Sequence, residues 1–328
     1  MAKIELEKIK SFVKIVKQIK KLLTKFSWKK MNKSQRRETI VFYLFISPWI
    51  IGFTVLTFGP MIVSFWYSLT EYNMLQPPLY MGFENYRRLL TNDPLFWKSL
   101  YNTFYYVIFS VPLSLTTGVV LAILLNQKIK AMPLFRTTFY LPSIVPMIAS
   151  AFLWIWIFNP RLGLLNKTLG LLGMPDNILW LSSEVWSKPA LIIMSLWGVG
   201  GSMIIFLAGL QGIPEQLYEA ARIDGATSRK QFRHITLPLL TPTIFFNLIM
   251  GLIGAFQTFA QVYVITNGEG GPLNSTLFYM LYLYRQAFEF FHMGYASAMA
   301  WILFVIIMTF TLIQLKFSGR WVFYQGDI

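Results

Sequence analysis

The sequence predicts an all-α integral membrane protein with six transmembrane helices. Hydrophobic residues make up 55% of the 328 residues and charged residues only 13%, whereas a soluble domain carries about 25% charged residues. Six mostly apolar stretches reach the roughly 20 residues that a helix needs to cross a bilayer, and none has a charged residue in its middle. They span residues 40–68, 100–126, 136–158, 189–211, 239–264 and 294–315.

The distribution of Lys and Arg orients these helices. If the N-terminus is cytoplasmic, 22 of the 29 Lys and Arg residues fall in inside segments and 7 in outside segments. Cytoplasmic loops of membrane proteins carry such an excess of positive charge, so we expect a multi-pass protein with both termini in the cytoplasm. The same distribution argues against nucleic-acid binding despite the net charge of +15, because no basic, aromatic-studded domain stands out.

Three regions follow from this pattern. Residues 1–38 hold 13 Lys and Arg residues and form a basic cytoplasmic segment. Its apolar residues fall on one face of a helix, which predicts an amphipathic helix. This segment is either a plain cytosolic extension or a helix on the anionic inner leaflet. Residues 39–318 form the six-helix transmembrane domain, and residues 319–328 form a cytoplasmic tail.

The composition argues against several kinds of chemistry. The chain has no Cys, and its two His residues, His234 and His292, lie far apart, so we expect neither a disulfide scaffold nor a Cys- or His-based metal site. The 14 acidic residues are scattered, without paired acids at helical spacing that face a cavity. No G-x-x-x-x-G-K-[ST] phosphate loop occurs. We therefore predict no catalytic residue, no metal and no cofactor bound by this chain.

The connection between the fourth and fifth apolar stretches carries several helix signals. Pro214 suits the first helical position, and Gly225 suits a left-handed helix stop. Ser228 and Gln231 have the spacing of a capping box for a second helix, and Pro238 ends that helix or starts the next span. The connection is predicted to form two short helices that meet at Gly225 on the cytoplasmic side.

This connection also carries a specific resemblance. The pattern Glu219-Ala220-Ala221, three residues, Gly225, nine residues, Ile235, one residue, Leu237-Pro238 is similar to the EAA loop of ABC-importer permeases. Seven such positions match by chance about once in 10⁸ starts. The resemblance implies the importer permease fold, with a cytoplasmic coupling helix-turn-helix that docks on a separate ATPase. The implied coupling residues are Glu219, Ala220, Ala221, Asp224 and Gly225.

Further stretches resemble carbohydrate-importer permeases of the maltose and glycerol-phosphate type. Together, and in order, they span most of residues 40–315. The resemblance implies a translocation path for a sugar or oligosaccharide, and a permease for another solute, such as polyamine, phosphate or peptide, is the alternative. The stretches are Gly82-Phe83-Glu84-Asn85-Tyr86, Phe96 to Thr103, Leu141-Pro142-Ser143-Ile144-Val145-Pro146, Gly270-Gly271-Pro272 and Gly294 to Ala298.

The resemblance also implies substrate contacts on the third, fourth and fifth helices. Gln257 and Thr258 are the strongest candidates, with Gln261 one turn on, because polar groups inside membrane spans are often functional. Trp154 or Trp197 would stack on a pyranose ring. The alternative is that these polar groups hydrogen-bond between helices. The full candidate set is Ser143, Met147, Ser195, Gly198, Gln257, Thr258 and Gln261.

The resemblance finally implies partners and a location. A second homologous permease, favoured as a different chain, completes the path, two ATPase subunits bind ATP and Mg²⁺, and an extracytoplasmic solute-binding protein delivers the solute. The chain contacts membrane lipid in the bacterial plasma (inner) membrane. Two other classes remain as alternatives. An ion-coupled secondary transporter would usually bury Asp, Glu or His in a span, and no predicted span here contains one in its middle. A membrane-embedded enzyme, such as a lipid-linked transferase, would need clustered carboxylates or a metal site.

Overall fold

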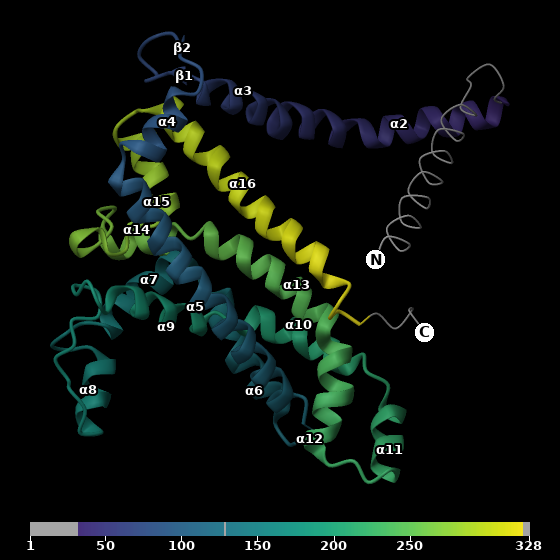
Figure 1. The fold of residues 1–328 in the computed structure, drawn as a ribbon. Coiled ribbons are helices and arrows are strands. Elements are labelled where there is room, and N and C mark those ends of the chain that lie inside the picture. Colours follow the sequence, from purple (N-terminus) through teal and green to yellow (C-terminus); the bar gives the residue numbers. More distant parts are fainter. Residues whose placement is uncertain (1–31, 128, 324–328) are drawn as a thin grey trace. The chain divides into compact units, whose positions relative to one another are not determined.

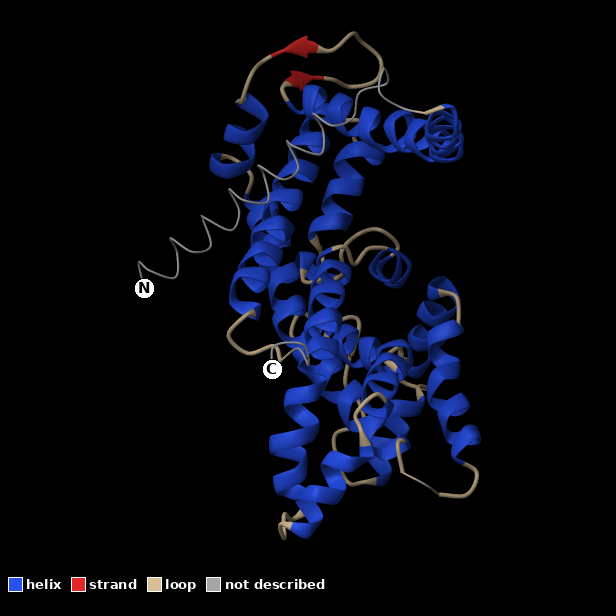
Figure 2. Ribbon diagram, turned by 90° about the vertical axis from the view of Figure 1, so that its right-hand side faces the viewer, coloured by secondary structure: helices blue, strands red, loops and turns tan. Residues whose placement is uncertain are grey.

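The computed structural model describes residues 32–127 and 129–323. The regular secondary structure of these residues is almost entirely helical (Figures 1 and 2). The described residues contain one pair of short antiparallel strands, β1 (Thr70–Glu71) and β2 (Leu79–Tyr80). Apart from this pair, the predicted all-α class is confirmed.

The first of two structural units ends at Val63, and its described part is one helical run. The run consists of α2 (Lys33–Phe53), a π-helical turn η2 (Thr54–Phe58) and the start of α3 (Gly59–Ser68). No side chain of α2 is buried. The first predicted span is present, and its helix starts before residue 38. The amphipathic helix predicted further upstream lies outside the described residues.

The second unit begins at Ser64 and holds the remaining elements. In chain order after the strands they are α4 (Glu84–Thr91), α5 (Pro94–Leu125), α6 (Met132–Tyr140), η3 (Leu141–Ile144), α7 (Met147–Ile157), α8 (Leu164–Leu171), α9 (Ser187–Trp197), α10 (Gly200–Gln211), α11 (Glu215–Ile223), α12 (Ser228–Gln231), η4 (Phe232–Thr236), α13 (Leu237–Phe256), α14 (Ala260–Thr266), η5 (Pro272–Asn274), α15 (Tyr279–Tyr284), η6 (Arg285–Glu289) and α16 (Met293–Ser318). Helix α5 is central, because it packs against α9, α10, α13 and α15.

The predicted spans appear as four long helical runs and two bent pairs of helices. The long runs are Lys33–Ser68, Pro94–Leu125, Ser228–Thr266 and Met293–Ser318, and the described residues hold six spans if each bent pair crosses once. The third and fourth predicted spans are therefore not single straight helices. The α6–η3 segment meets α7 at 100°, and α9 meets α10 at 47°. Prolines and glycines at the two breaks remove or weaken the helical hydrogen bonds there.

Two π-helical turns each precede a proline in a long helix. Turn η2 ends just before Gly59-Pro60, and turn η4 ends just before Leu237-Pro238. A proline lacks the backbone N–H, and its ring clashes with the carbonyl four residues earlier. The wider π turn relieves this clash. As a result α12 continues through η4 into α13, so the prediction of a separate second short helix in the 213–238 connection is wrong in this detail.

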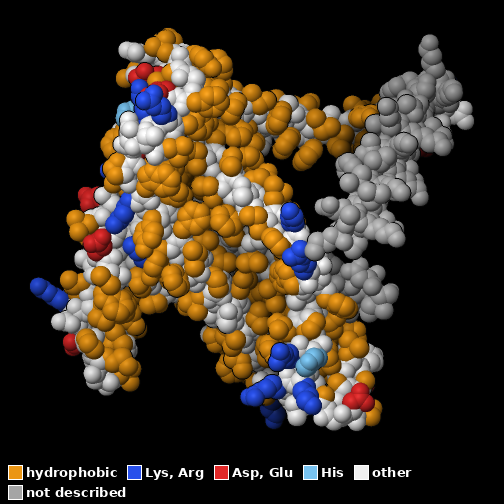
Figure 3. Space-filling view, viewed as in Figure 1, with side chains coloured by type: hydrophobic (Ala, Val, Ile, Leu, Met, Phe, Trp, Pro, Cys, Tyr) orange, Lys and Arg blue, Asp and Glu red, His pale blue; other side chains and the backbone are white. Residues whose placement is uncertain are grey.

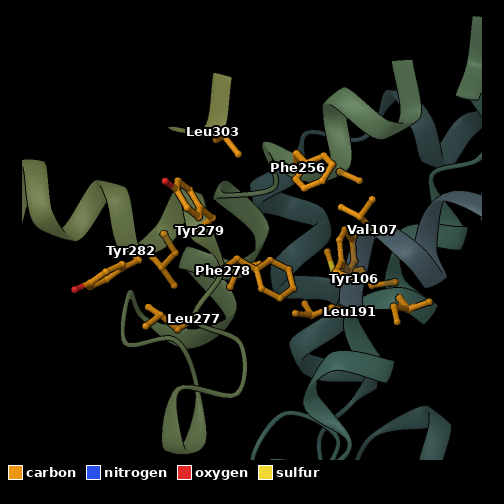
Figure 4. Close-up of a cluster of buried hydrophobic side chains, with 14 of the residues drawn as sticks. Tyr106, Val107, Leu191, Phe256, Leu277, Phe278, Tyr279, Tyr282 and Leu303 are labelled. Atoms are coloured by element: carbon orange, nitrogen blue, oxygen red, sulfur yellow. The ribbon is translucent and has the colours of Figure 1, made fainter. Parts of the chain in front are cut away.

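The main hydrophobic core joins elements that are far apart in the sequence. Figure 4 shows Tyr106 of α5, Phe256 of α13 and Phe278 next to α15 in one cluster. The rings of Tyr106 and Phe278 lie 5.2 Å apart. A second core cluster around Phe206 packs the far end of α5 against α10 and the start of α13. These two clusters hold the helices around the central helix α5.

Buried polar groups attach the loop between η5 and α15 to α5. The Asn102 side-chain amide donates to the carbonyl oxygens of Asn274, at 2.8 Å, and Leu277, at 3.1 Å. The Thr103 hydroxyl accepts from the backbone N–H of Tyr279 at 2.8 Å. Hydrogen bonds of this kind satisfy backbone groups that would otherwise be buried without a partner. The Phe96 to Thr103 stretch therefore has a structural role in this fold.

Asp93 ties the start of α5 to α15 and α16. Its carboxylate accepts from the backbone N–H of Phe96 at 3.0 Å, which caps α5. It also accepts from the hydroxyls of Tyr282, at 2.7 Å, and Tyr295, at 2.6 Å. Burial, and then the bond to Asp93, raise the pKa of Tyr282, so its hydroxyl keeps the proton that it donates. The carboxylate thus joins three helices with one side chain.

Replacing Asp93 with alanine is expected to destabilise the folded chain. The change removes a helix cap and leaves two partly buried tyrosine hydroxyls without the acceptor of their hydrogen bonds. Together these losses should lower the free energy of unfolding by about 2–4 kcal/mol. The melting temperature of the purified chain in detergent measures the effect. Asp176→Ala is the control, because Asp176 is exposed and makes no side-chain hydrogen bond within the described residues. Equal melting temperatures for the two variants would contradict the assigned role.

Candidate functional site

The second unit has an open cavity of about 840 Å³ beside the middle of α5. Its walls come from α5, α7, the α9–α10 break, α13, the α13–α14 break and α15. The lining residues are Tyr106, Ser110, Val111, Ser114, Leu115, Met147, Ser195, Gly198, Val199, Ser202, Asn247, Met250, Gly251, Gly254, Ala255, Gln257, Thr258, Phe259, Ala260, Gln261 and Met280.

Three interruptions of helices meet at this cavity. Met147 is the first residue of α7, after the 100° bend, and Gly198 lies at the 47° bend. Gln257, Thr258 and Phe259 separate α13 from α14. Non-helical backbone inside apolar segments is tolerated where it is buried in protein or lines a water-filled cavity. The three breaks therefore fit a part of the bundle whose backbone lines a cavity.

A tight approach of two helices fixes one of these breaks. A Cβ atom on Gly200 would lie 2.5 Å from the carbonyl oxygen of Phe139 and 2.8 Å from the Cα of Tyr140. A side chain at this position would push α10 away from the end of α6. Glycine therefore allows α10 to start here, beside the cavity-lining residue Gly198.

The cavity lining is uncharged, and hydroxyl and amide groups interrupt a largely apolar wall. No Asp, Glu, Lys, Arg or His is among the described residues that line it. Ser195 donates to the carbonyl of Ile192 at 2.7 Å, and Gln261 donates to the Tyr106 hydroxyl at 3.4 Å. A hydroxyl that donates to its own helix keeps its oxygen as an acceptor. The Gln257 side chain is exposed and makes no hydrogen bond to another residue in the part of the chain that the structure describes. This arrangement suits a neutral solute rich in hydroxyl groups.

The structure brings together six of the seven residues in the predicted substrate path. Met147, Ser195, Gly198, Gln257, Thr258 and Gln261 all line the cavity. Ser143 is absent from the lining, and its hydroxyl donates to the carbonyl of Tyr140 within the bent segment. Contact with substrate stays a prediction for the whole set.

Neither tryptophan proposed for ring stacking lines the cavity. The Trp154 side chain is buried, and its ring lies 6.3 Å from that of Trp197 in the main core. Tyr106, Ser110, Ser114, Ser202 and Asn247 line the cavity but were missed from the sequence. Polar residues inside apolar stretches were the available signal for them.

The predicted coupling residues lie on and directly after α11. Glu219 and Ala220 are exposed, and Ala221 is half-buried. Asp224 ends the helix, and Gly225 has φ +73 with open space around it. The predicted left-handed stop at Gly225 is confirmed.

Two cap details of the 213–238 connection differ from the prediction. Pro214 is the N-cap of α11 and not its first helical residue, since its ψ of 129 is extended. The N-cap of α12 is Thr227, without a side-chain cap bond, so Ser228 does not form the predicted capping box. The Gln231 side chain instead donates to the carbonyl of Ala226 at 3.0 Å.

Helix α11 is attached to the bundle by the face opposite its exposed residues. The Tyr218 hydroxyl lies 3.0 Å from that of Thr236 in η4. Tyr218 and Ile235 also pack against the second core cluster, which contains Ile213. Lys and Arg side chains gather at this end of the second unit (Figure 3). Packed side chains therefore connect α11 to α10 and α13.

Comparison with known proteins agrees with these features. Residues 96–323 match the family described as "Binding-protein-dependent transport system inner membrane component". The chain is 46% identical over 298 residues to the probable ABC transporter permease protein YesP of Bacillus subtilis (strain 168). This match covers 90% of this chain and 96% of YesP. It is 37% identical to the lactose transport system permease protein LacF of Rhizobium radiobacter, with 83% of this chain and 92% of LacF covered.

The fold has a close solved counterpart. A chain from the crystal structure of a bacterial alginate ABC transporter, in complex with an alginate pentasaccharide-bound periplasmic protein, superposes with a TM-score of 0.75 at 23% identity. The superposition covers 87% of this chain and 96% of that chain. The chain therefore belongs to the family of binding-protein-dependent transport system inner membrane components, and it is a membrane-embedded permease subunit of an ABC transporter and not an enzyme.

Proposed function

We propose that the cavity is the part of the translocation path that holds a neutral sugar or oligosaccharide during import. The observation that carries this proposal is the absence of charge from the described lining, combined with hydroxyl and amide groups at or beside two of the three helix breaks. A charged solute such as a polyamine, phosphate or a peptide terminus would bury its charge there without a partner, which is costly. The relative named for lactose transport supports the same class of solute.

The exposed face of α11 is proposed to dock on a separate ATPase subunit. Ala220 has only a methyl side chain, so this face can enter a groove, and Glu219 supplies a charge for a cationic partner. ATP and Mg²⁺ would bind to that partner. Its movement would pass through Tyr218 to α13 and change access to the cavity.

The complete importer is proposed to contain further subunits. A second, homologous permease of different sequence would close the path, because one bundle of this size leaves the cavity incompletely enclosed. Two ATPase subunits would bind at the α11 side, and an extracytoplasmic binding protein would bind at the opposite side. The excess of Lys and Arg in the predicted inside segments supports a multi-pass topology with both termini cytoplasmic.

Co-purification and transport assays test this function together. We expect the full chain, purified from its native membranes, to carry an ATPase and a second permease that mass spectrometry identifies. In proteoliposomes, the purified complex with its binding protein should take up neutral di- and oligosaccharides in an ATP-dependent manner.

Matched solutes decide the substrate class. Radiolabelled spermidine, phosphate and a short peptide serve as charged test solutes, each supplied at the same concentration as the sugars. Uptake of one of these, with no sugar uptake, would replace the sugar assignment by another solute. If the chain purifies without any ATPase, the proposed assembly is wrong.

A further inference from the structure

A second concave site lies outside the translocation cavity, in the cleft between α5 and α9. This apolar groove has a volume of about 460 Å³ and runs from Tyr105 to Thr116 on α5 and from Pro189 to Ile193 on α9. Its lining includes exposed side chains such as Ile108 and Ile193. It shares no lining residue with the cavity described above.

A lysine lies at one end of this groove. The Lys188 ammonium is 5.5 Å from the ring centroid of Tyr105, which lines the groove, and 5.8 Å from that of Tyr101. It donates to the side-chain oxygen of Asn102 at 3.3 Å and to the carbonyl of Ser275 at 3.4 Å. An ammonium group has three donors, so one remains for a ligand.

The charge at this end of the groove is positive. Within the described residues, the nearby Lys98 and Glu184 neutralise each other in an ion pair at 3.3 Å, and no carboxylate forms an ion pair with Lys188. An anion beside Lys188 would therefore meet one unneutralised positive charge. A phosphate diester is an anion that accepts such a charge-assisted hydrogen bond.

Exposed aromatic residues mark the level of this lysine as a membrane interface. Trp97, Tyr101 and Trp186 are all exposed near the starts of α5 and α9. Trp and Tyr gather at the level of lipid headgroups in membrane proteins. The end of the groove that holds Lys188 thus lies at headgroup level, and the rest runs toward the membrane interior.

The length of the groove selects its occupant. The path along α5 from Tyr105 to Thr116 is about 16 Å at 1.5 Å per residue, which is close to half of a hydrocarbon core of about 30 Å. A transmembrane helix from a partner would need a groove about twice as long. One acyl chain from a single leaflet fits this length.

We propose that this groove binds one acyl chain of an anionic diacyl phospholipid, with the lipid phosphate on the ammonium of Lys188. The negative charge of the headgroup matches Lys188, and the single acyl chain matches the apolar groove. The proposal requires the membrane location that the family shows, and it is independent of the transported solute.

Native mass spectrometry of the complete importer in detergent tests this site. Phosphatidylglycerol is added to the delipidated complex, and the bound fraction is measured for the wild type, Lys188→Ala and Ile193→Trp. Both variants should lower the affinity for this lipid about tenfold, which corresponds to loss of about 1.4 kcal/mol. Ile193→Trp fills the groove without touching Lys188, so it remains informative if Lys188→Ala disturbs the Ser275 loop.

Two matched control variants make the same kinds of substitution at positions outside the groove. Lys167→Ala removes an exposed lysine elsewhere, and Leu124→Trp enlarges an exposed residue of α5 outside the groove; neither should change binding. Inorganic phosphate alone should not displace the lipid. The proposal fails if both test variants bind like wild type, or if phosphatidylethanolamine binds equally well. It also fails if a photoreactive residue at Phe109 crosslinks to the second permease instead of lipid.

Discussion

Valine in place of Gly225 is expected to stop solute uptake by the importer while the chain still folds. Gly225 has φ +73, where an L-residue pays about 1–2 kcal/mol. The turn after α11 would relax away from this conformation and re-aim Glu219 and Ala220. A docking loss of about 1.4 kcal/mol or more lowers affinity for the ATPase tenfold or more.

The control for this prediction has the same backbone strain. Gly173 has φ +74, and no atom lies within 4 Å of a Cβ built there, as at Gly225. Gly173→Val and Gly225→Val should therefore lower the melting temperature by similar amounts. Co-purification should show the ATPase with Gly173→Val and little of it with Gly225→Val. Equal recovery of the ATPase with both variants would show that Gly225 has no role in docking on the ATPase.

Phenylalanine in place of Gly254 is expected to block transport and leave the assembly intact. Gly254 lines the cavity in the last turn of α13, and no atom lies within 4 Å of a Cβ built on it. The new phenyl ring would enter the cavity, and its Cβ atom would not clash with any neighbouring atom. Phe also has a higher helix propensity than Gly, by up to about 0.5 kcal/mol, so the helix should persist. Uptake in proteoliposomes should fall at least about tenfold, the effect of a 1.4 kcal/mol penalty on solute binding.

Gly201→Phe separates a blocked cavity from a general effect of a bulky residue. Gly201 is also a helical glycine with no atom within 4 Å of a built Cβ, but it does not line the cavity. This variant should transport normally. Both variants should retain the ATPase, in contrast to Gly225→Val. If Gly254→Phe transports at the wild-type rate, the cavity is not the translocation path.

Hydropathy and turn chemistry were readable from the sequence because they are local properties. An apolar stretch long enough to cross a bilayer is recognisable whatever its neighbours are, and the runs Pro94–Leu125 and Met293–Ser318 agree with their predictions. The left-handed turn at Gly225 follows from the freedom of glycine at positive φ. The 213–238 connection was recognised by its residue pattern, although its second helix proved continuous with α13.

The broken spans were not readable from the sequence. Hydropathy is a sum over residues and is unchanged when a helix bends, so residues 136–158 read as one span although α6–η3 and α7 meet at 100°. Proline is compatible with both a kinked membrane helix and a broken one. The contacts that neighbouring helices make, such as that of Gly200 with the end of α6, decide between them.

The residues that share the cavity were also decided by tertiary structure. Gln257, Thr258 and Gln261 were predicted as a local group, whereas Tyr106 joins Gln261 from 155 residues away. Ser143 has the same kind of hydroxyl as Ser110, yet only Ser110 lines the cavity. A polar residue in an apolar stretch shows that some partner or cavity is needed, because an unpaired group in lipid is costly. Helix packing alone determines which partner or cavity satisfies it.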